Sequence, residues 1–280
     1  MLYFKKRKCI KMYRLIINLP CQNEFIIVSN IKNLYNILQL KYGKYVQHCP
    51  GGKTCSDIIE IYQTSEKYIL KYNNKLSIVS SAIQALSQII SANKKLLPSC
   101  FALHGAALEK KGKAYLFIAS SGTGKTTLTS YLLTKGLNYI TDDCIIISKD
   151  TLLITPYSTP LQLRKGGYEL LSKLNIELEN VKKLEEHSIT YRYSFFPTNC
   201  ITQEIPIDKI FFINRSESKN ELTELSSIEK NKLLIEASIV QISLNIETIS
   251  FISQLSKIKA YKLTYNSLDY ISEVLLENEL

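Results

Sequence analysis

The residues best suited to chemistry form one short run, ASSGTGKT, at positions 119–126. It fits the phosphate-loop pattern G-x-x-x-x-G-K-[ST], except that Ala119 replaces the first glycine. Gly122 and Gly124 allow backbone N–H groups to turn inward toward phosphate oxygens. Lys125 is expected on the β- and γ-phosphates and the Thr126 hydroxyl on Mg²⁺. The predicted phosphate-binding residues are Ala119, Ser120, Ser121, Gly122, Thr123, Gly124, Lys125, Thr126 and Thr127.

The elements around this run support a nucleotide-phosphate site. Residues 114–119 are apolar on both faces, as expected for a buried parallel strand. The following helix carries Leu128, Tyr131 and Leu132 on one face and should stop at Gly136, placing a positive helix end under the phosphates. A second strand, 137–140, leads to Asp142 and Asp143. A fortuitous Gly/Ser/Thr turn does not explain the lysine and the acidic pair together.

Two further residues could take part. His104 interrupts the apolar strand 101–108, which is expected to form a hairpin with the phosphate-loop strand through a turn at 111–113. Arg164 lies in an extended segment just before a helix that opens at Gly166-Gly167. From spacing alone, His104 fits a core histidine equally well and Arg164 a surface arginine, so both roles stay open.

Length and composition set the frame for these motifs. A chain of 280 residues with 45% hydrophobic residues predicts one large or two modest globular domains. No apolar run of about 18 residues is present, so no membrane span is expected. The cysteines are scattered without a C-x-x-C pair, which favours reduced thiols and a cytoplasmic location.

The net charge of +10 favours anionic partners, such as a nucleotide or an acidic protein. The lysines of the chain are spread along the sequence, so nucleic-acid binding is not favoured. The sequence also leaves open whether the chain forms a homo-oligomer.

The first hundred residues contain no catalytic constellation, and we expect a small α+β domain over 1–98. Strands are predicted at 12–18, 25–29, 58–62 and 68–72, a helix up to about Leu40, and an amphipathic helix over 76–90. The run Gly51-Gly52-Lys53-Thr54 imitates a phosphate loop, but no buried strand precedes it. We therefore interpret it as a surface turn.

In the last hundred residues, a buried strand is predicted at 207–214, helices at about 225–236 and 245–256, and a strand at 260–265 before a final helix. Residues 175–194 are charged and weakly periodic, which suggests a mobile flap. His187 within them is interpreted as a solvated bystander.

Together these motifs resemble the catalytic domain of the HPr kinase/phosphorylase family, which is structurally akin to the ATP-dependent phosphoenolpyruvate carboxykinases. The resemblance rests on His104-Gly105, the loop ASSGTGKT, the pair Asp142-Asp143, and LQLR at 161–164 beside the family's L-E-I-R-G. It covers about residues 100–170 well. It implies an α/β P-loop kinase core over 99–280, preceded by an N-terminal domain unlike that of the true HPr kinases.

The resemblance also implies roles for single residues. Asp143 would be the general base toward a serine hydroxyl, Asp142 would support Mg²⁺ with Thr126, and Lys125 and His104 would assist phosphate chemistry. Gln162 stands where the family has a Mg²⁺-binding glutamate, which argues against the reverse, phosphate-driven reaction.

The function expected is therefore an ATP-dependent serine kinase with a Ser/Thr acceptor on a protein or peptide. Similar enzymes occur with peptide-modification systems. Two alternatives remain: a small-molecule kinase, and a nucleotide-binding regulatory protein without transfer activity.

Overall fold

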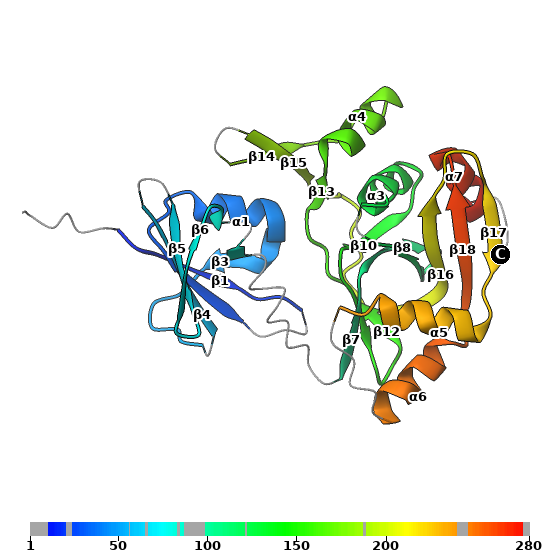
Figure 1. Cartoon of the computed structure of the whole chain (residues 1–280), viewed down its shortest axis with the longest axis horizontal. Coiled ribbons are helices and arrows are strands. Elements are labelled where there is room, and N and C mark those ends of the chain that lie inside the picture. The colour runs from blue at the N-terminus through cyan, green and yellow to red at the C-terminus, as the bar shows by residue number, and fades with distance from the viewer. Residues whose placement is uncertain are drawn as a thin grey trace, which may run out of the picture. The chain divides into compact units, whose positions relative to one another are not determined.

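The computed structural model describes residues 11–20, 24–55, 57–64, 67–82, 85–86, 99–120, 122–186, 189–239 and 246–276. The chain has a mixed α/β fold with sheets of six, nine and three strands. It divides into two compact units, Met1–Lys95 and Leu96–Leu280 (Figure 1).

The first unit contains the six-stranded sheet, in the order β3-β1-β2-β4-β5-β6. In this sheet β2 and β4 pair in parallel, and the other neighbours pair antiparallel. Between β2 and β3, helix α1 (Leu34–Tyr42) buries Leu34, Leu38 and Tyr42 and is followed by the short 3-10 helix η1 (Gly43–Tyr45). The strands are β1 (Tyr13–Ile17), β2 (Phe25–Ser29), β3 (Val46–His48), β4 (Asp57–Gln63), β5 (Tyr68–Tyr72) and β6 (Lys75–Val79).

The helix expected over 76–90 is wrong at its start, because Lys75–Val79 is strand β6. Asn73 and Asn74 both have positive φ (48° and 59°), and Tyr72 pairs with Lys75. Two such residues in a two-residue loop reverse the chain into a hairpin before a helix can begin. Residues 83–84 and 87–90 of the expected helix lie outside the described residues.

The surface turn predicted at Gly51–Thr54 is confirmed. Gly51 and Gly52 form the turn, with φ +80° at Gly52. Lys53 forms an ion pair with Glu24 at 2.8 Å, so its ammonium group is already engaged within the first unit.

The second unit is built on the nine-stranded sheet, in the order β10-β8-β9-β16-β12-β11-β7, with β18 also pairing with β16 and β17 with β18. The apolar strand expected over 101–108 is broken at His104 into two strands. The strands are β7 (Cys100–Leu103), β8 (Gly105–Lys110), β9 (Lys113–Ile118), β10 (Asn138–Asp142), β11 (Ile145–Ser148), β12 (Leu153–Thr155), β16 (Ile205–Arg215), β17 (Glu221–Glu224) and β18 (Lys259–Tyr265).

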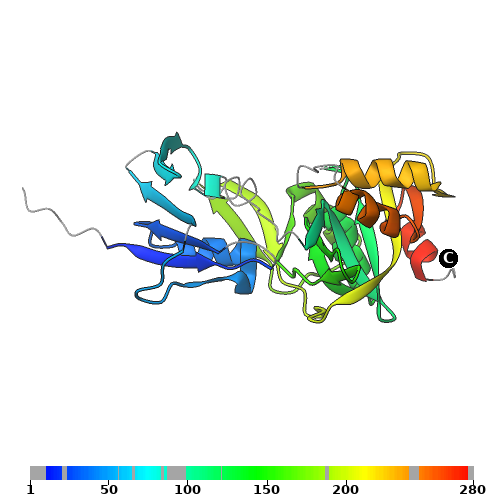
Figure 2. The same cartoon turned by 90° about the horizontal axis from the view of Figure 1, so that it is seen from below.

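Helices cover both faces of this sheet, because its central strands are apolar on both sides. Phe117 and Phe211 belong to the core cluster that includes side chains of α3 (Lys125–Thr134), α4 (Lys165–Lys173) and α7 (Leu268–Leu276). Their neighbours Leu116 and Ile210 belong to the opposite cluster, with α5 (Ser227–Glu236) and α6 (Ile246–Leu255). Figure 2 shows α5 and α6 lying together on their side of the sheet.

The segment 175–194, predicted as a mobile flap, contains two paired strands. Strands β14 (Lys182–Glu186) and β15 (Ile189–Phe195) pair antiparallel, and β15 also pairs with β13 (Leu161–Leu163). His187 lies outside the described residues.

The strand register brings distant residues to one edge of the nine-stranded sheet. Gly105 at the start of β8 pairs with Ile118 at the end of β9, so His104 and the phosphate loop meet there. Asp142, the last residue of β10, pairs with Ala106 on the other side of β8. The sheet thus places the histidine, the loop and the acidic pair at one edge.

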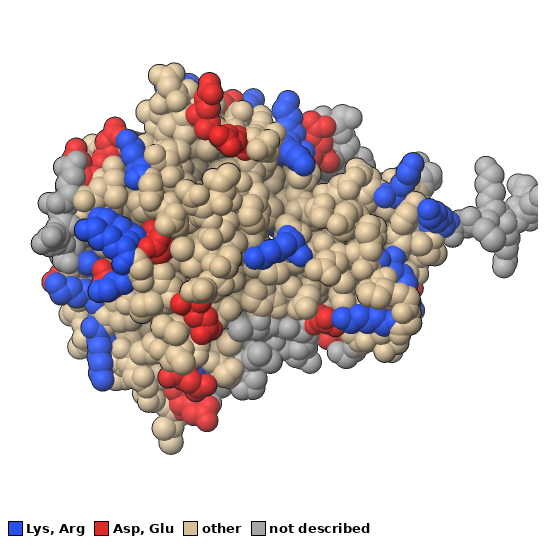
Figure 3. Space-filling view, turned by 180° about the vertical axis from the view of Figure 1, so that it is seen from behind, with Lys and Arg blue, Asp and Glu red and all other residues tan. Residues whose placement is uncertain are grey.

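None of the helices in the described part of the chain is long and apolar enough to cross a membrane. Lys and Arg side chains are interspersed with Asp and Glu on the face drawn in Figure 3. The excess positive charge does not gather there into one dense block.

Gly105→Ala should destabilise the protein by about 1–3 kcal/mol, as expected for overpacking. A Cβ at this position would lie 2.8 Å from both the Phe117 carbonyl oxygen and the Ile145 side chain. Denaturant unfolding measures the loss. Gly166→Ala, with no atom within 4 Å of the added carbon, is the matched control. Equal stability of the two variants would contradict this account of the β8–β9 junction.

Candidate active site

The phosphate loop connects β9 to α3 with two glycines in left-handed conformation. Gly122 and Gly124 have φ of +91° and +95°, values that strongly favour glycine. The Thr123 hydroxyl donates to the Ser120 carbonyl at 2.9 Å and holds the turn closed. Helix α3 begins at Lys125, so its free N–H groups face the loop. Ser121 lies outside the described residues.

The Lys125 side chain lies inside this turn and is only 7% exposed. Its ammonium group donates to the carbonyl oxygens of Ala119 at 2.7 Å and Ser120 at 3.0 Å. Burial lowers the pKa of Lys125, against the opposing charges of Asp142 and Asp143. The ammonium is thus held at the loop by weak neutral acceptors, which a phosphate oxygen can replace.

His104 lies between the acidic pair and the phosphate-loop lysine. Its Nδ1 lies 3.1 Å from the carbonyl oxygen of Asp143, and its Nε2 lies 3.2 Å from Lys125 Nζ. A carbonyl can only accept, so Nδ1 carries the proton, and Nε2 of the neutral ring accepts from the ammonium. His104 therefore links the acidic pair to the phosphate-loop lysine.

Asp142 is a buried carboxylate beside the first turn of α3. Its Oδ2 accepts a 2.7 Å hydrogen bond from the Thr126 hydroxyl, and its Oδ1 has no hydrogen-bond partner among the described residues. Burial, followed by the negative charge of Asp143, raises the pKa of Asp142 to about 7; the Thr126 hydrogen bond and Lys125 oppose this shift. The site therefore leaves one buried oxygen available for a cation or a proton.

Asp143 differs from its neighbour in exposure and in backbone. It is exposed and has a φ of +93°, a conformation that is costly for a non-glycine residue. The turn directs its carbonyl toward His104. An exposed carboxylate next to a buried one can meet a second substrate that approaches from solvent.

Arg164 and Thr127 lie where α4 meets the phosphate loop. Arg164 is the N-cap residue of α4, and a guanidinium nitrogen lies 4.0 Å from where a Cβ of Gly122 would be. This places its charge beside the loop, as expected for a phosphate ligand. The Thr127 hydroxyl instead faces Gly167 of α4, too close for any side chain there. A phosphate would therefore meet the Thr127 backbone rather than its hydroxyl.

Tyr265 is a site residue that the sequence did not indicate. It ends β18 and is 3% exposed, and its hydroxyl donates to the Thr123 carbonyl at 3.4 Å. Burial raises the pKa of this phenol. Its only sequence signal is its place at the end of an apolar strand, which does not show that the strand reaches the loop.

The site suits Mg²⁺ bound together with a phosphate ligand. Among the described residues, no three His, Cys, Asp or Glu side chains gather into a self-contained metal site. Mg²⁺ is commonly held by one or two protein oxygens plus waters and substrate phosphates. Thr126 and Asp142, with its unpartnered oxygen, supply such a pair.

Comparison with protein-family models and with curated proteins finds no match. Among solved structures, the chain is similar to the HPr(Ser) kinase/phosphatase from Coxiella burnetii, with a TM-score of 0.31 and 13% sequence identity. The matched region covers 63% of this chain and 94% of that one. The function must therefore be inferred from the site residues themselves.

Without Mg²⁺, Asp142→Asn should raise the melting temperature at pH 8 by several degrees and have a much smaller effect at pH 4. The carboxyl pKa rises from 3.8 unfolded to about 7 folded, so ionisation costs stability progressively across that range. At pH 8 the full cost of ionising the buried carboxyl applies, and the neutral amide of the Asn variant removes this cost. Thermal melts in EDTA measure this.

The matched control is Asp150→Asn, which removes an exposed carboxylate in a turn. It should melt as the unmodified protein does at both pH values. If Asp142→Asn behaved in the same way as this control, the carboxyl of Asp142 would not carry the burial cost inferred here.

Proposed function

We propose that this protein is an ATP-dependent kinase that transfers the γ-phosphoryl group to a Ser or Thr hydroxyl of a protein or peptide. The phosphate loop, with Lys125 and Arg164, would bind the phosphates, and Thr126 with Asp142 would hold Mg²⁺. Bound there, Mg²⁺ would neutralise charge on the phosphates. Asp143 would act as general base.

One observation carries this proposal: the adjacent aspartates occupy different environments. Asp142 is buried and bonded to Thr126, whereas Asp143 is exposed at the same strand end. Phosphoryl transfer needs a metal-holding carboxylate beside the phosphates and a second one free to take a proton. The sequence resemblance to the HPr kinase/phosphorylase family supports the same division.

The proposed transfer accounts for each bond that forms or breaks and for the proton that is released. The acceptor oxygen forms a bond to the γ-phosphorus as the bond to the ADP oxygen breaks, and the hydroxyl proton passes to the Asp143 carboxylate. His104, through its bond to the Asp143 carbonyl, would hold the turn that presents this carboxylate. Lys125 would leave its loop carbonyls and move onto the phosphates.

Asp143→Asn should leave Mg·ATP binding nearly unchanged and reduce transfer by about 10²-fold or more, because the general base is lost.

Lys125→Ala should weaken nucleotide binding and abolish transfer. The assay follows label from γ-labelled ATP into a degenerate library of Ser- and Thr-containing peptides, with nucleotide affinity measured in parallel.

Asp150→Asn is the matched carboxylate control and should retain full transfer. Nucleotide binding without transfer to any library peptide or small hydroxyl compound would contradict the kinase proposal and favour a regulatory nucleotide-binding protein. Transfer only to small hydroxyl compounds would favour a small-molecule kinase.

The direction of the reaction depends on Gln162. This residue lies in β13 opposite Ser194, two positions before Arg164. A neutral amide binds Mg²⁺ more weakly than a carboxylate. Attack of inorganic phosphate on a phosphoserine brings two anions together, so it should depend more strongly on metal charge.

The unmodified protein should therefore form little pyrophosphate from phosphorylated product, Mg²⁺ and inorganic phosphate, and Gln162→Glu should increase this activity. Gln203→Glu, at an exposed position in the loop before β16, is the matched control. Rapid pyrophosphate formation by the unmodified protein would contradict the argument.

A further inference from the structure

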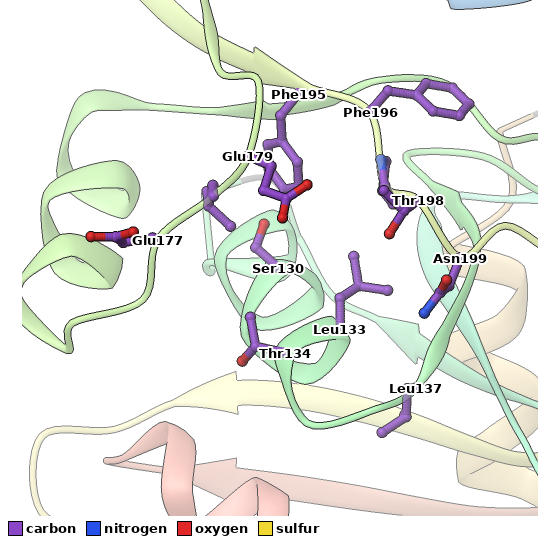
Figure 4. Close-up of a pocket in the computed structure, with 12 residues that line it drawn as sticks. Ser130, Leu133, Thr134, Leu137, Glu177, Glu179, Phe195, Phe196, Thr198 and Asn199 are labelled. Atoms are coloured by element: carbon purple, nitrogen blue, oxygen red, sulfur yellow. The ribbon is translucent and has the colours of Figure 1, made fainter.

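A cavity in the second unit lies at the far end of α3 from the phosphate loop. It has a volume of about 150 Å³ and is formed by the second half of α3, the loop after α4 and residues 195–199 (Figure 4). We call it the α3 pocket. None of the residues placed in the phosphate site above lines it.

Part of its wall is apolar, and the rest is polar or acidic. Leu133 and Leu137 form the side contributed by α3 and the residues after it, Leu178 comes from the loop after α4, and Phe195 ends β15. Phe196, next to them, keeps 44% of its surface exposed. A cavity of about 150 Å³ lined by such side chains has room for one benzene-sized ring.

The polar groups of the pocket select the charge of a ligand. Thr134 donates its hydroxyl proton to the Tyr131 carbonyl at 2.7 Å, so its oxygen offers a ligand acceptor lone pairs. The Ser130 hydroxyl donates to the Thr126 carbonyl at 2.7 Å and is fully buried. Glu177 and Glu179 add carboxylates and form no ion pair with a described residue.

Among the described residues, no Lys or Arg lines the pocket, although the chain carries a net charge of +10. In Figure 4, Glu179 lies between Phe195 and Ser130, whereas Glu177 lies farther along the loop toward α4. The pocket therefore favours a ring with a cation beside it and disfavours phosphate.

We propose that the α3 pocket docks an aromatic side chain of the acceptor peptide, with a neighbouring Lys or Arg facing Glu179. This inference rests on the proposed kinase function. The carboxylates beside the pocket are complementary to a basic residue next to the docked ring. A phosphate-rich nucleotide would be repelled from it.

The length of α3 gives a scale for the spacing between the docked side chain and an acceptor hydroxyl placed near Lys125. From Lys125 to Thr134 is nine residues of α3, about 14 Å at about 1.5 Å per residue. An extended chain covers about 3.3 Å per residue, so about four residues bridge that distance. The acceptor Ser or Thr should lie about four residues from the aromatic residue.

The test measures binding of labelled peptides to the full chain without nucleotide. The probe is Gly-Ser-Gly-Gly-Gly-Phe-Arg-Gly, and its two controls replace Phe by Ala or Arg by Glu. The Phe-Arg peptide should bind at least five-fold more tightly than either control. Glu179→Lys should reverse the preference between the Arg and Glu peptides, since position 179 is exposed and the change should not disturb folding.

Glu273→Lys, an equal charge change on an exposed site of α7, should leave the peptide preference unchanged. Thr134→Trp should fill the pocket and weaken the binding of the Phe-Arg peptide. Equal binding of the three peptides, or the same preference in Glu179→Lys as in Glu273→Lys, would overturn the docking proposal. Selective binding without phosphorylation would support the docking proposal. It would contradict only the proposed kinase function.

Discussion

The buried carboxylate of Asp142 is the constraint on which the rest of the site depends. One of its oxygens is bonded to Thr126 and the other is unpartnered among the described residues, so its negative charge is costly in the free protein. The charge becomes favourable only when a cation or proton reaches it. Binding of a cation or a proton removes this penalty, so burial strengthens the binding of either one.

The sheet provides this arrangement through register rather than through loops. Strand β8 lies between β10 and β9, so Asp142 and the phosphate loop lie on either side of it, and His104 precedes it. Gly105 allows β8 to pass close to the Phe117 carbonyl. Tyr265, at the end of β18, supports the loop from another strand.

Local sequence predicted the strand, the glycine turn and the helix around Lys125 well, because these signals act within about twenty residues of chain. It could not predict contacts that depend on strand pairing. The bonds of His104 to Lys125 and to Asp143 require the β8 register, and the place of Tyr265 requires β18 to lie beside β16.

Residues 76–79 were misread because their apolar spacing suits a helix, whereas the preceding asparagine turn makes them a strand. The charged strand β17 was missed because most of its side chains are exposed and show no apolar periodicity.

The central claim, that Asp142 holds Mg²⁺ beside the nucleotide phosphates, is tested most directly by proton release on binding. Titration calorimetry of ATP at saturating Mg²⁺ and pH 7, in two buffers of different ionisation enthalpy, counts the protons exchanged. With a pKa of about 7, Asp142 is about half protonated in the free protein and must release this proton to bind the metal. We predict a net release of about half a proton that Asp142→Asn abolishes. Nucleotide binding without proton release, or with the same release in Asp142→Asn, would contradict the account.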